Sequence, residues 1–376
     1  MDIGVIRRDF PITRRLIYMN NASSAPMPIS SIKAITDYIL FESEHGPDSR
    51  IVSDRIEEIT IDTRRRLSKM LRCKEEEIIF TQSTTDGINF VSQGLRLKKG
   101  DNIIIRDSIH EHPSNYIPWA RLEDRCEVRR LNIDEDGSID LEELEELIDD
   151  NTKVIALSHA LFNTGLILPV EEVGKIAKKY NVPFFIDAAQ TVGCLDVDLS
   201  KIDCNFLSFT GSKWLCGPSG IGVFYCRKDS QDMLEPLLSG FESMFVKDDK
   251  LLLKDIPDRF EAGFRNYIGI VGLNASLKYI MNVGIDNIRE RNMRLADMLR
   301  EGLKDKKVYG PEEDHKRTSI VSFALDDVDS AIEKLEKNNI IFAKRDISGK
   351  NIVRASPHFF NDEREVLEAL NVIRTL

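Results

Sequence analysis

The sequence predicts an α/β fold in which helices cover both faces of a mostly parallel sheet. Short apolar runs typical of buried strands, such as 154–158 and 184–187, are separated by stretches with helical periodicity. Strands of parallel sheets are buried on both faces and read as nearly continuous hydrophobic runs, as these do. Polar residues follow directly after several runs, at the strand ends where ligands bind in such sheets.

The expected elements follow one another in a regular order. Helical periodicity spans 29–43 and 53–72, and a further helix is expected at 86–95. The expected strands are 77–81, 102–105, 126–131, 154–158, 184–187, 204–208 and 221–225. They predict a seven-stranded, mostly parallel sheet sandwiched by helices.

Beyond about residue 275 the alternation changes. One long amphipathic helix is expected over 283–303, because charges alternate along it. Shorter strands and helices follow it, at 320–324, 328–337, 340–343, 352–356 and 364–376. We therefore expect a large domain over 16–280 and a small C-terminal α+β domain over 281–376, to which residues 1–15 also belong.

Composition limits the class of protein. The chain has 376 residues, of which 42% are hydrophobic and 31% charged, and a net charge of −11 that argues against a nucleic-acid partner. No signal peptide and no apolar run of membrane-spanning length is found, so we expect a cytoplasmic protein with no membrane partner. The six cysteines have no metal-ligand spacing, and His110 and His112 have no third ligand in sequence, so we expect no metal site.

Two strand ends carry the residues that pyridoxal phosphate (PLP) chemistry needs. Lys213 follows the apolar run 206–209, and Asp187 ends the run 182–186. A lysine can form an imine with the cofactor, and an aspartate can keep the ring nitrogen protonated. Gln190 comes three residues after Asp187, within reach of the ring hydroxyl. The alternative is that Lys213 is a solvated strand end and that Asp187 caps the next helix.

Further polar segments fit the same cofactor. Residues 82–89 lie between a strand and a helix, where hydroxyls and free N–H groups form an anion cup; a plain N-cap is the alternative. Thr210 and Ser212 flank Lys213 and can donate to a phosphate. His112 follows the strand at 102–106 and can stack on an aromatic ring, or it is an ordinary loop histidine.

Together these motifs resemble the class V aminotransferase family of fold-type I PLP enzymes, which includes cysteine desulfurases, isopenicillin N epimerase-like proteins and kynureninases. The likeness runs from residues 18–23 to residues 354–361. It implies that Lys213 is the Schiff-base lysine and that Arg354 binds the substrate carboxylate, with Asn21 also at the substrate. It also implies a set of cofactor contacts: Thr84, Thr85, His112, Asn163, Asp187, Gln190, Thr210, Ser212 and Lys213. Of these, Lys213, Asp187 and His112 are expected to be catalytic.

The chain departs from this family at a thiol. Cysteine desulfurases carry a nucleophilic cysteine in the loop before the Arg354 segment. Here that stretch is 344–350, and no cysteine follows Cys226. A serine such as Ser348 cannot replace a thiolate in persulfide chemistry, which disfavours a desulfurase.

Three other positions also differ. Ser212 stands where many relatives have histidine. Phe264 replaces a small hydroxyl residue that contacts the neighbouring subunit's phosphate, a contact that Arg265 is then expected to make instead. An ungapped alignment puts Phe162, with Asn163 beside it, at the family's asparagine.

The resemblance implies a homodimeric PLP enzyme acting on an amino acid. We expect an aminotransferase in which Lys213 moves the Cα proton while Arg354 fixes the carboxylate. An epimerase-like racemase and a desulfurase-like C–S lyase use the same residues and remain alternatives. A non-catalytic PLP-binding scaffold protein is a further alternative, motivated by Phe162 and Phe264.

Overall fold

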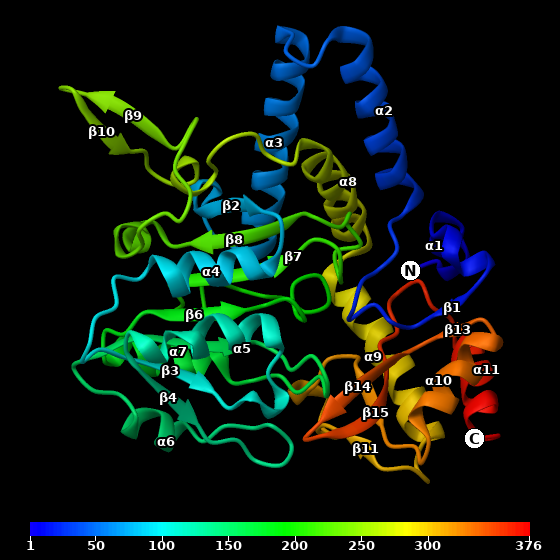
Figure 1. The fold of residues 1–376 in the computed structure, drawn as a ribbon. Helices are drawn as coiled ribbons and strands as arrows, with labels where there is room; N and C mark the ends of the chain where they lie inside the picture. Colours follow the sequence, from blue (N-terminus) through cyan, green and yellow to red (C-terminus); the bar gives the residue numbers. More distant parts are fainter.

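A computed structural model describes residues 1–376, and its largest element is a seven-stranded sheet (Figure 1). The sheet has the order β2-β8-β7-β6-β5-β3-β4. Its strands are β2 (Ile78–Thr81), β3 (Asn102–Arg106), β4 (Glu127–Leu131), β5 (Thr152–Ser158), β6 (Phe184–Asp187), β7 (Phe206–Thr210) and β8 (Gly222–Cys226). β8 runs in the direction opposite to the other six strands, so both of its pairings are antiparallel, and all other pairings are parallel. The predicted seven-stranded, mostly parallel sheet is confirmed.

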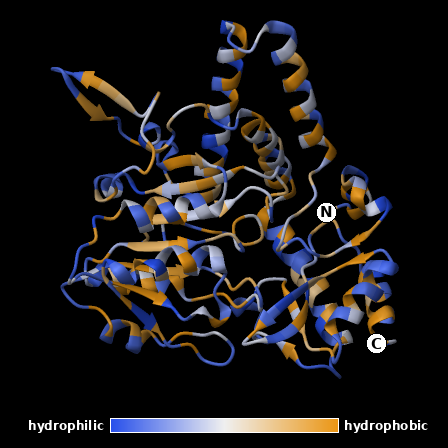
Figure 2. Ribbon diagram, viewed as in Figure 1, coloured by the Kyte–Doolittle hydropathy of each residue, from blue (hydrophilic) through white to orange (hydrophobic).

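Helices cover both faces of this sheet because its strands are apolar on both sides. Phe184 and Ile186 belong to one buried cluster, and Phe185 between them belongs to the other. The first cluster includes residues of α3 (Arg50–Leu71), α7 (Val170–Lys179) and α8 (Tyr267–Val283), and the second includes residues of α4 (Thr84–Gly94) and α5 (Pro113–Ala120). Figure 2 shows apolar strands between helices whose outer faces are more polar.

The C-terminal part contains a separate antiparallel sheet of order β11-β12-β15-β14. Its strands are β11 (Val308–Tyr309), β12 (Val321–Phe323), β14 (Ala343–Ile347) and β15 (Lys350–Ala355). The helices α9 (Ile285–Gly302), α10 (Val328–Lys337) and α11 (Glu363–Ile373) share one buried core with it. These separate cores are consistent with the two domains expected, whose boundaries we retain as a proposal.

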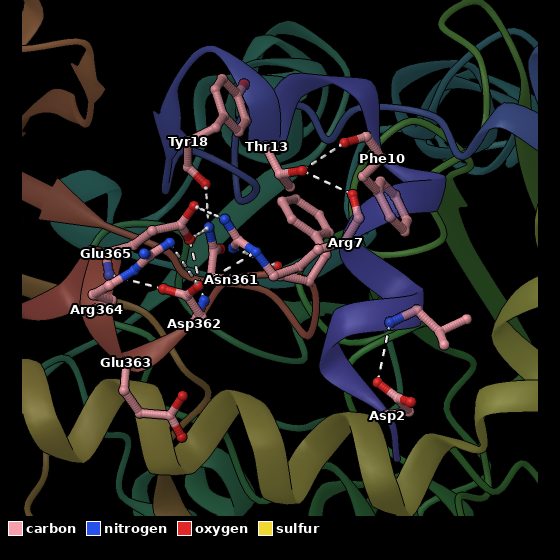
Figure 3. A network of polar contacts seen from close by, with 12 residues as sticks. Asp2, Arg7, Phe10, Thr13, Tyr18, Asn361, Asp362, Glu363, Arg364 and Glu365 are labelled. Carbon is pink, nitrogen blue, oxygen red and sulfur yellow. Dashed lines mark hydrogen bonds and ion pairs between the residues drawn. The ribbon is translucent and has the colours of Figure 1, made fainter.

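The N-terminus is tied to this C-terminal part. Helix α1 (Ile3–Asp9) contributes Arg7, which pairs with Asp362 at 3.3 Å and with Glu365 at 2.9 Å (Figure 3). Strand β1 (Ile17–Tyr18) pairs with β13 (Ile340–Ile341). These contacts bring the first residues of the chain beside the last helix, and we retain the assignment of residues 1–15 to the small domain as a proposal.

The helix expected over 283–303 is confirmed as α9, which begins at Ile285. Gly284 before it has a φ of 88°, outside the helical region, and α8 and α9 meet there at 78°. One expected segment differs from the structure. Residues 344–350, expected as a loop, form most of β14 and a tight turn into β15. No single helix is long and apolar enough to cross a membrane, although the bent pair α8 and α9 passes that test jointly.

Two projections extend away from the sheet (Figure 1). Helices α2 (Ile29–His45) and α3 form one, and the hairpin of β9 (Met244–Lys247) and β10 (Lys250–Leu253) forms the other. The remaining short helix α6 (Leu141–Glu146) lies between β4 and β5 in the chain.

Candidate active site

The carboxyl ends of the central strands surround a cavity of about 180 Å³. Ser158 at the end of β5 lies opposite Asp187 at the end of β6, and β7 ends alongside at Thr210. The cavity is lined by Ser83, Thr84, Thr85, His112, Ser114, Ser158, Ala160, Phe162, Asp187, Ala189, Gln190, Thr210, Ser212 and Lys213. All the cofactor residues expected from the sequence, apart from Asn163, are in this set.

Lys213 lies in a compact loop between β7 and β8. The Gly217 N–H donates to Gly211 O at 2.8 Å, and the Cys216 N–H donates to Lys213 O at 2.8 Å. A Cβ on Gly217 would lie 2.9 Å from Gly211 O, so the close approach requires glycine. The loop therefore holds the backbone of Lys213 in a defined position at the cavity.

The lysine and the aspartate perturb each other's proton affinities. Burial raises the pKa of Asp187 to about 6, against the opposing effects of the Ala189 N–H and Lys213. Burial likewise lowers the pKa of Lys213 to about 8, while Asp187 opposes this shift and Arg354 and Arg345 add to it. Shifts of this size in a cleft are typical of catalytic groups.

The N-terminus of α4 forms one end of the cavity. Ser83 is the N-cap, as the plain-cap alternative expected, and its Oγ accepts from Asp86 N at 3.3 Å. Thr84 and Thr85 of the first helical turn nevertheless line the cavity, and first-turn N–H groups have no partner within a helix. Thr210 Oγ1 and Ser212 Oγ lie 3.0 Å apart. Hydroxyls and a helix N-terminus here suit a phosphate.

His112 is held at the cavity wall by the start of α5. Its Nδ1 accepts from Ser114 N at 3.2 Å, and its ring meets that of Phe162 edge-on, with centroids 4.9 Å apart. Burial, together with the neighbouring cations Lys213, Arg345 and Arg354, lowers the pKa of His112 to about 4. The imidazole is therefore neutral, which suits stacking against an aromatic ring.

Arg354 is a buried cation without an anionic partner. It is 1% exposed, and it donates from Nη1 to Phe162 O at 2.6 Å and from Nη2 to Asn20 Oδ1 at 3.2 Å and Ser23 Oγ at 2.6 Å. Its Nε has no hydrogen-bond partner. Burial lowers its pKa well below the ordinary value, and the neighbouring Arg345 adds to this effect. An incoming carboxylate would compensate the buried charge.

Asn21 lies near this arginine without lining the cavity. Its Nδ2 donates to Ser356 O at 2.8 Å, and its Oδ1 is buried with no partner. Its expected role at the substrate remains a prediction.

Asn163 lies behind the cavity wall. Its Oδ1 is 3.3 Å from His110 Nδ1, and its Nδ2 donates to Asp346 O at 3.4 Å. Phe162 lines the cavity instead, so a contact between Asn163 and the cofactor remains a prediction without geometric support.

The segment expected at a subunit interface is organised differently from the expectation. The guanidinium of Arg265 donates to Glu261 and to Asp258, the latter at 3.3 Å. Phe264 beside it is 89% exposed. Arg265 is thus engaged within its own chain, which disfavours the phosphate contact expected of it.

Two features around the cavity were not expected from the sequence. The first is Ser158, which donates to the buried Glu111; a carboxylate oxygen of Glu111 also lies 3.4 Å from Arg106 Nη1. The expected pairing of the strands at 154–158 and 184–187 could have placed Ser158 beside Asp187. Arg345 donates to Ser23 Oγ, but nothing in its local sequence distinguishes it from a surface arginine.

The donor set fits PLP at every end of the cofactor. An anion cup, an acid, a buried lysine and a flat neutral imidazole surround one cavity, and a buried guanidinium lacking an anion lies next to it. Fold and cavity together define a fold-type I PLP-dependent enzyme.

The aminotransferase class-V family model matches residues 17–366, and the chain belongs to this family. It is 34% identical over 297 residues to a probable cysteine desulfurase of Methanothermobacter thermautotrophicus, covering 78% of this chain and 74% of the relative. The apo structure of a cysteine desulfurase from Thermococcus onnurineus superimposes with a TM-score of 0.93 at 31% identity, covering 100% of this chain and 98% of that one.

A third similar protein is the cystine C–S lyase C-DES. Its complex with its reaction product, cysteine persulfide, superimposes with a TM-score of 0.88 at 25% identity, covering 96% of this chain and 98% of that one. Another C-DES structure has glycine covalently linked to the PLP cofactor. These findings confirm the family, the fold and PLP as the cofactor; the named relatives match the C–S lyase alternative better than the expected aminotransferase.

Proposed function

We propose that this chain is a PLP-dependent lyase that cleaves the Cβ–S bond of a disulfide-containing amino acid such as L-cystine, without using a thiol of its own. The named relatives support C–S chemistry, and C-DES supports the cystine-cleaving form of it. The observation that carries the proposal is the hairpin of β14 and β15, which contributes Arg345 and no cysteine to the surroundings of the cavity.

The hairpin leaves no room for a cysteine-bearing loop. Ile347 pairs directly with Lys350, and Ser348 and Gly349 form a two-residue turn with φ of 53° and 80°. None of the six cysteines lines the cavity. Five are buried and Cys73 is half-buried, and burial raises the pKa of the Cys73 thiol to about 12. No thiolate is therefore available to accept sulfur from a substrate.

Two guanidiniums suit a substrate with two carboxylates. Arg354 would bind the carboxylate next to the reacting Cα, and Arg345 would bind the distal one of cystine. Neither arginine has a carboxylate among its hydrogen-bond partners. A substrate with two carboxylates would relieve the repulsion between them.

The residues of this chain have distinct parts in the reaction. Bound PLP supplies an electron sink for the pair left on Cα. Lys213 would hold the cofactor and then take the Cα proton, a task that its lowered pKa favours near neutral pH. Thr84, Thr85, Thr210 and Ser212 would hold the phosphate, Asp187 the ring nitrogen and Gln190 the ring oxygen. His112 would stack on the ring.

The overall elimination needs no oxidant or reductant. The Cα proton goes to Lys213, and the Cβ–S bond breaks with its electron pair on sulfur, which leaves as cysteine persulfide. Water then converts the remaining three-carbon fragment to pyruvate and ammonia. A desulfurase would instead pass sulfur to an enzyme thiol and leave alanine.

Product analysis tests the proposal. The holoenzyme is incubated separately with L-cystine and with L-cysteine, with and without a keto acid as amino acceptor, and organic and sulfur products are quantified. Pyruvate with persulfide from cystine is expected. Alanine from cysteine would favour the activity named for the relatives, a sulfur-bearing keto acid would favour transamination, and either would contradict the lyase proposal.

We also propose that the chain forms a homodimer. Large apolar side chains are exposed on and near the projecting hairpin, namely Phe241, Val246, Leu251 and Phe264. Phe241 and Phe264 lie with their ring centroids 6.3 Å apart. A cluster of this kind is typical of an interaction surface.

A further inference from the structure

Trp214 follows Lys213 in the chain and is completely buried. Its Nε1 donates to Gln190 Oε1 at 2.9 Å, and Gln190 Nε2 donates to Ala22 O at 3.0 Å. An indole N–H can only donate and a carbonyl oxygen can only accept, so these two contacts fix the orientation of the Gln190 amide. Gln190 also lines the cavity, and the group it has left to offer there is the second N–H of Nε2, a donor.

Trp214 is itself held by the C-terminal part of the chain. His358 Nε2 donates to Trp214 O at 3.0 Å, and the imidazole lies edge-on to the indole with centroids 5.1 Å apart. Burial lowers the pKa of His358 to about 3, so the ring is neutral, and its Nδ1 can accept from Asn292 Nδ2 of α9 at 3.2 Å. A continuous chain of hydrogen bonds thus links α9 to Gln190 through Trp214.

We propose that Trp214 is a positioning residue that acts through Gln190: it turns an N–H of Gln190, and not the amide oxygen, toward the ring oxygen of PLP. A hydrogen bond donated to that oxygen favours its ionised form, whereas an amide oxygen would favour the protonated form. The inference rests on the proposed placement of the cofactor ring beside Gln190. It assigns to Trp214 a function that its burial alone would not require.

The test is a pH titration of the visible absorbance of the bound cofactor, which changes when the ring oxygen is protonated. Trp214→Phe removes the N–H and keeps an aromatic ring, and we expect the titration midpoint to rise by about one pH unit. Trp119→Phe is the matched control, because Trp119 is also fully buried and donates its Nε1–H to an amide oxygen, Asn115 Oδ1, at 3.2 Å. The control is expected to leave the midpoint unchanged.

A double-mutant cycle with Gln190→Ala separates the inference from its premise. If Trp214 acts through Gln190, Trp214→Phe shifts the midpoint in the wild-type background but not in the Gln190→Ala background. Equal shifts in both backgrounds, or no shift in either, would overturn the role of Trp214. A midpoint unchanged by Gln190→Ala would instead overturn the placement of the ring.

A second variant covers the case in which Trp214→Phe does not fold. Gln190→Glu keeps an acceptor for the indole and removes both N–H donors. A rise in the midpoint at least as large is expected from it, because the carboxylate also places a negative charge near the ring oxygen. An unchanged midpoint would contradict donation from Gln190.

Discussion

Arg345 and Arg354 donate to the same oxygen, Ser23 Oγ, which Arg354 Nη2 approaches to 2.6 Å. They come from the two strands of one hairpin, and the charge of Arg345 contributes to the lowered pKa of Arg354. Two cations sharing a neutral acceptor repel one another. The arrangement is explained if an anion binds between or beside them.

The first prediction concerns the selectivity that Arg345 gives. Arg345→Gln is expected to lower kcat/KM for L-cystine by about 10- to 100-fold, because a charge-assisted hydrogen bond to the distal carboxylate is lost. S-methyl-L-cysteine has a single carboxylate, so its kcat/KM should change by less than about threefold. Steady-state kinetics with both substrates measure this. Equal losses for the two would contradict a role for Arg345 in binding the distal carboxylate.

The second prediction concerns Lys213. Lys213→Ala is expected to abolish covalent attachment of PLP and to reduce pyruvate formation by at least about 10³-fold, because it removes both the attachment point and the proton acceptor. Lys201→Ala is a suitable control, since Lys201 is exposed and pairs with Asp198 at 3.7 Å. Absorbance after gel filtration, together with pyruvate release, provides the measurement. A Lys213→Ala variant that turns over normally would exclude the proposed site.

The third prediction concerns the cysteines. Changing each cysteine singly to alanine is expected to keep pyruvate formation from cystine within about twofold of wild type, because none lines the cavity. Buried positions such as Cys204 should lose some stability on truncation, so activity is compared at a temperature where each variant is folded. Loss of turnover in one folded variant would indicate a thiol-dependent route.

The sequence predicts the fold and the cavity well because both depend on local patterns. Apolar strands end in polar residues, and parallel strands bring their ends to one edge, which is sufficient to group Asp187, Lys213 and residues 82–89. Arg345 was missed because its place near the cavity depends on the pairing of β14 with β15. The residues around Arg345 do not by themselves indicate that pairing.

The fourth prediction concerns assembly. Sedimentation is expected to show a dimer. The double variant Val246→Ser, Phe264→Ser is expected to raise the dissociation constant of the dimer at least about tenfold, because two exposed apolar side chains are lost from the interface. Leu367→Ser is the control, since Leu367 is an exposed apolar residue of α11 away from the hairpin. A wild-type chain that sediments as a monomer while holding PLP would contradict the homodimer.

The fifth prediction is a pH dependence of apoprotein stability that originates at Asp187. Burial raises its pKa to about 6, above the value of about 4 for an unfolded chain, so the folded state binds the extra proton between these pH values. The contribution of Asp187 to stability is therefore fully present below about pH 4 and is lost as the pH rises through 6. The loss amounts to about 3 kcal/mol of unfolding free energy.

Denaturant unfolding of the wild-type apoprotein and of Asp187→Asn between pH 4 and 7 isolates this group from the other carboxylates. The free energy of unfolding of the wild type, relative to that of the variant, should fall as the pH rises, because asparagine does not ionise. A difference that stays constant over this range would show that folding does not raise the pKa of Asp187. Asp187 would then carry its negative charge toward the ring nitrogen without the cost in stability that its burial implies.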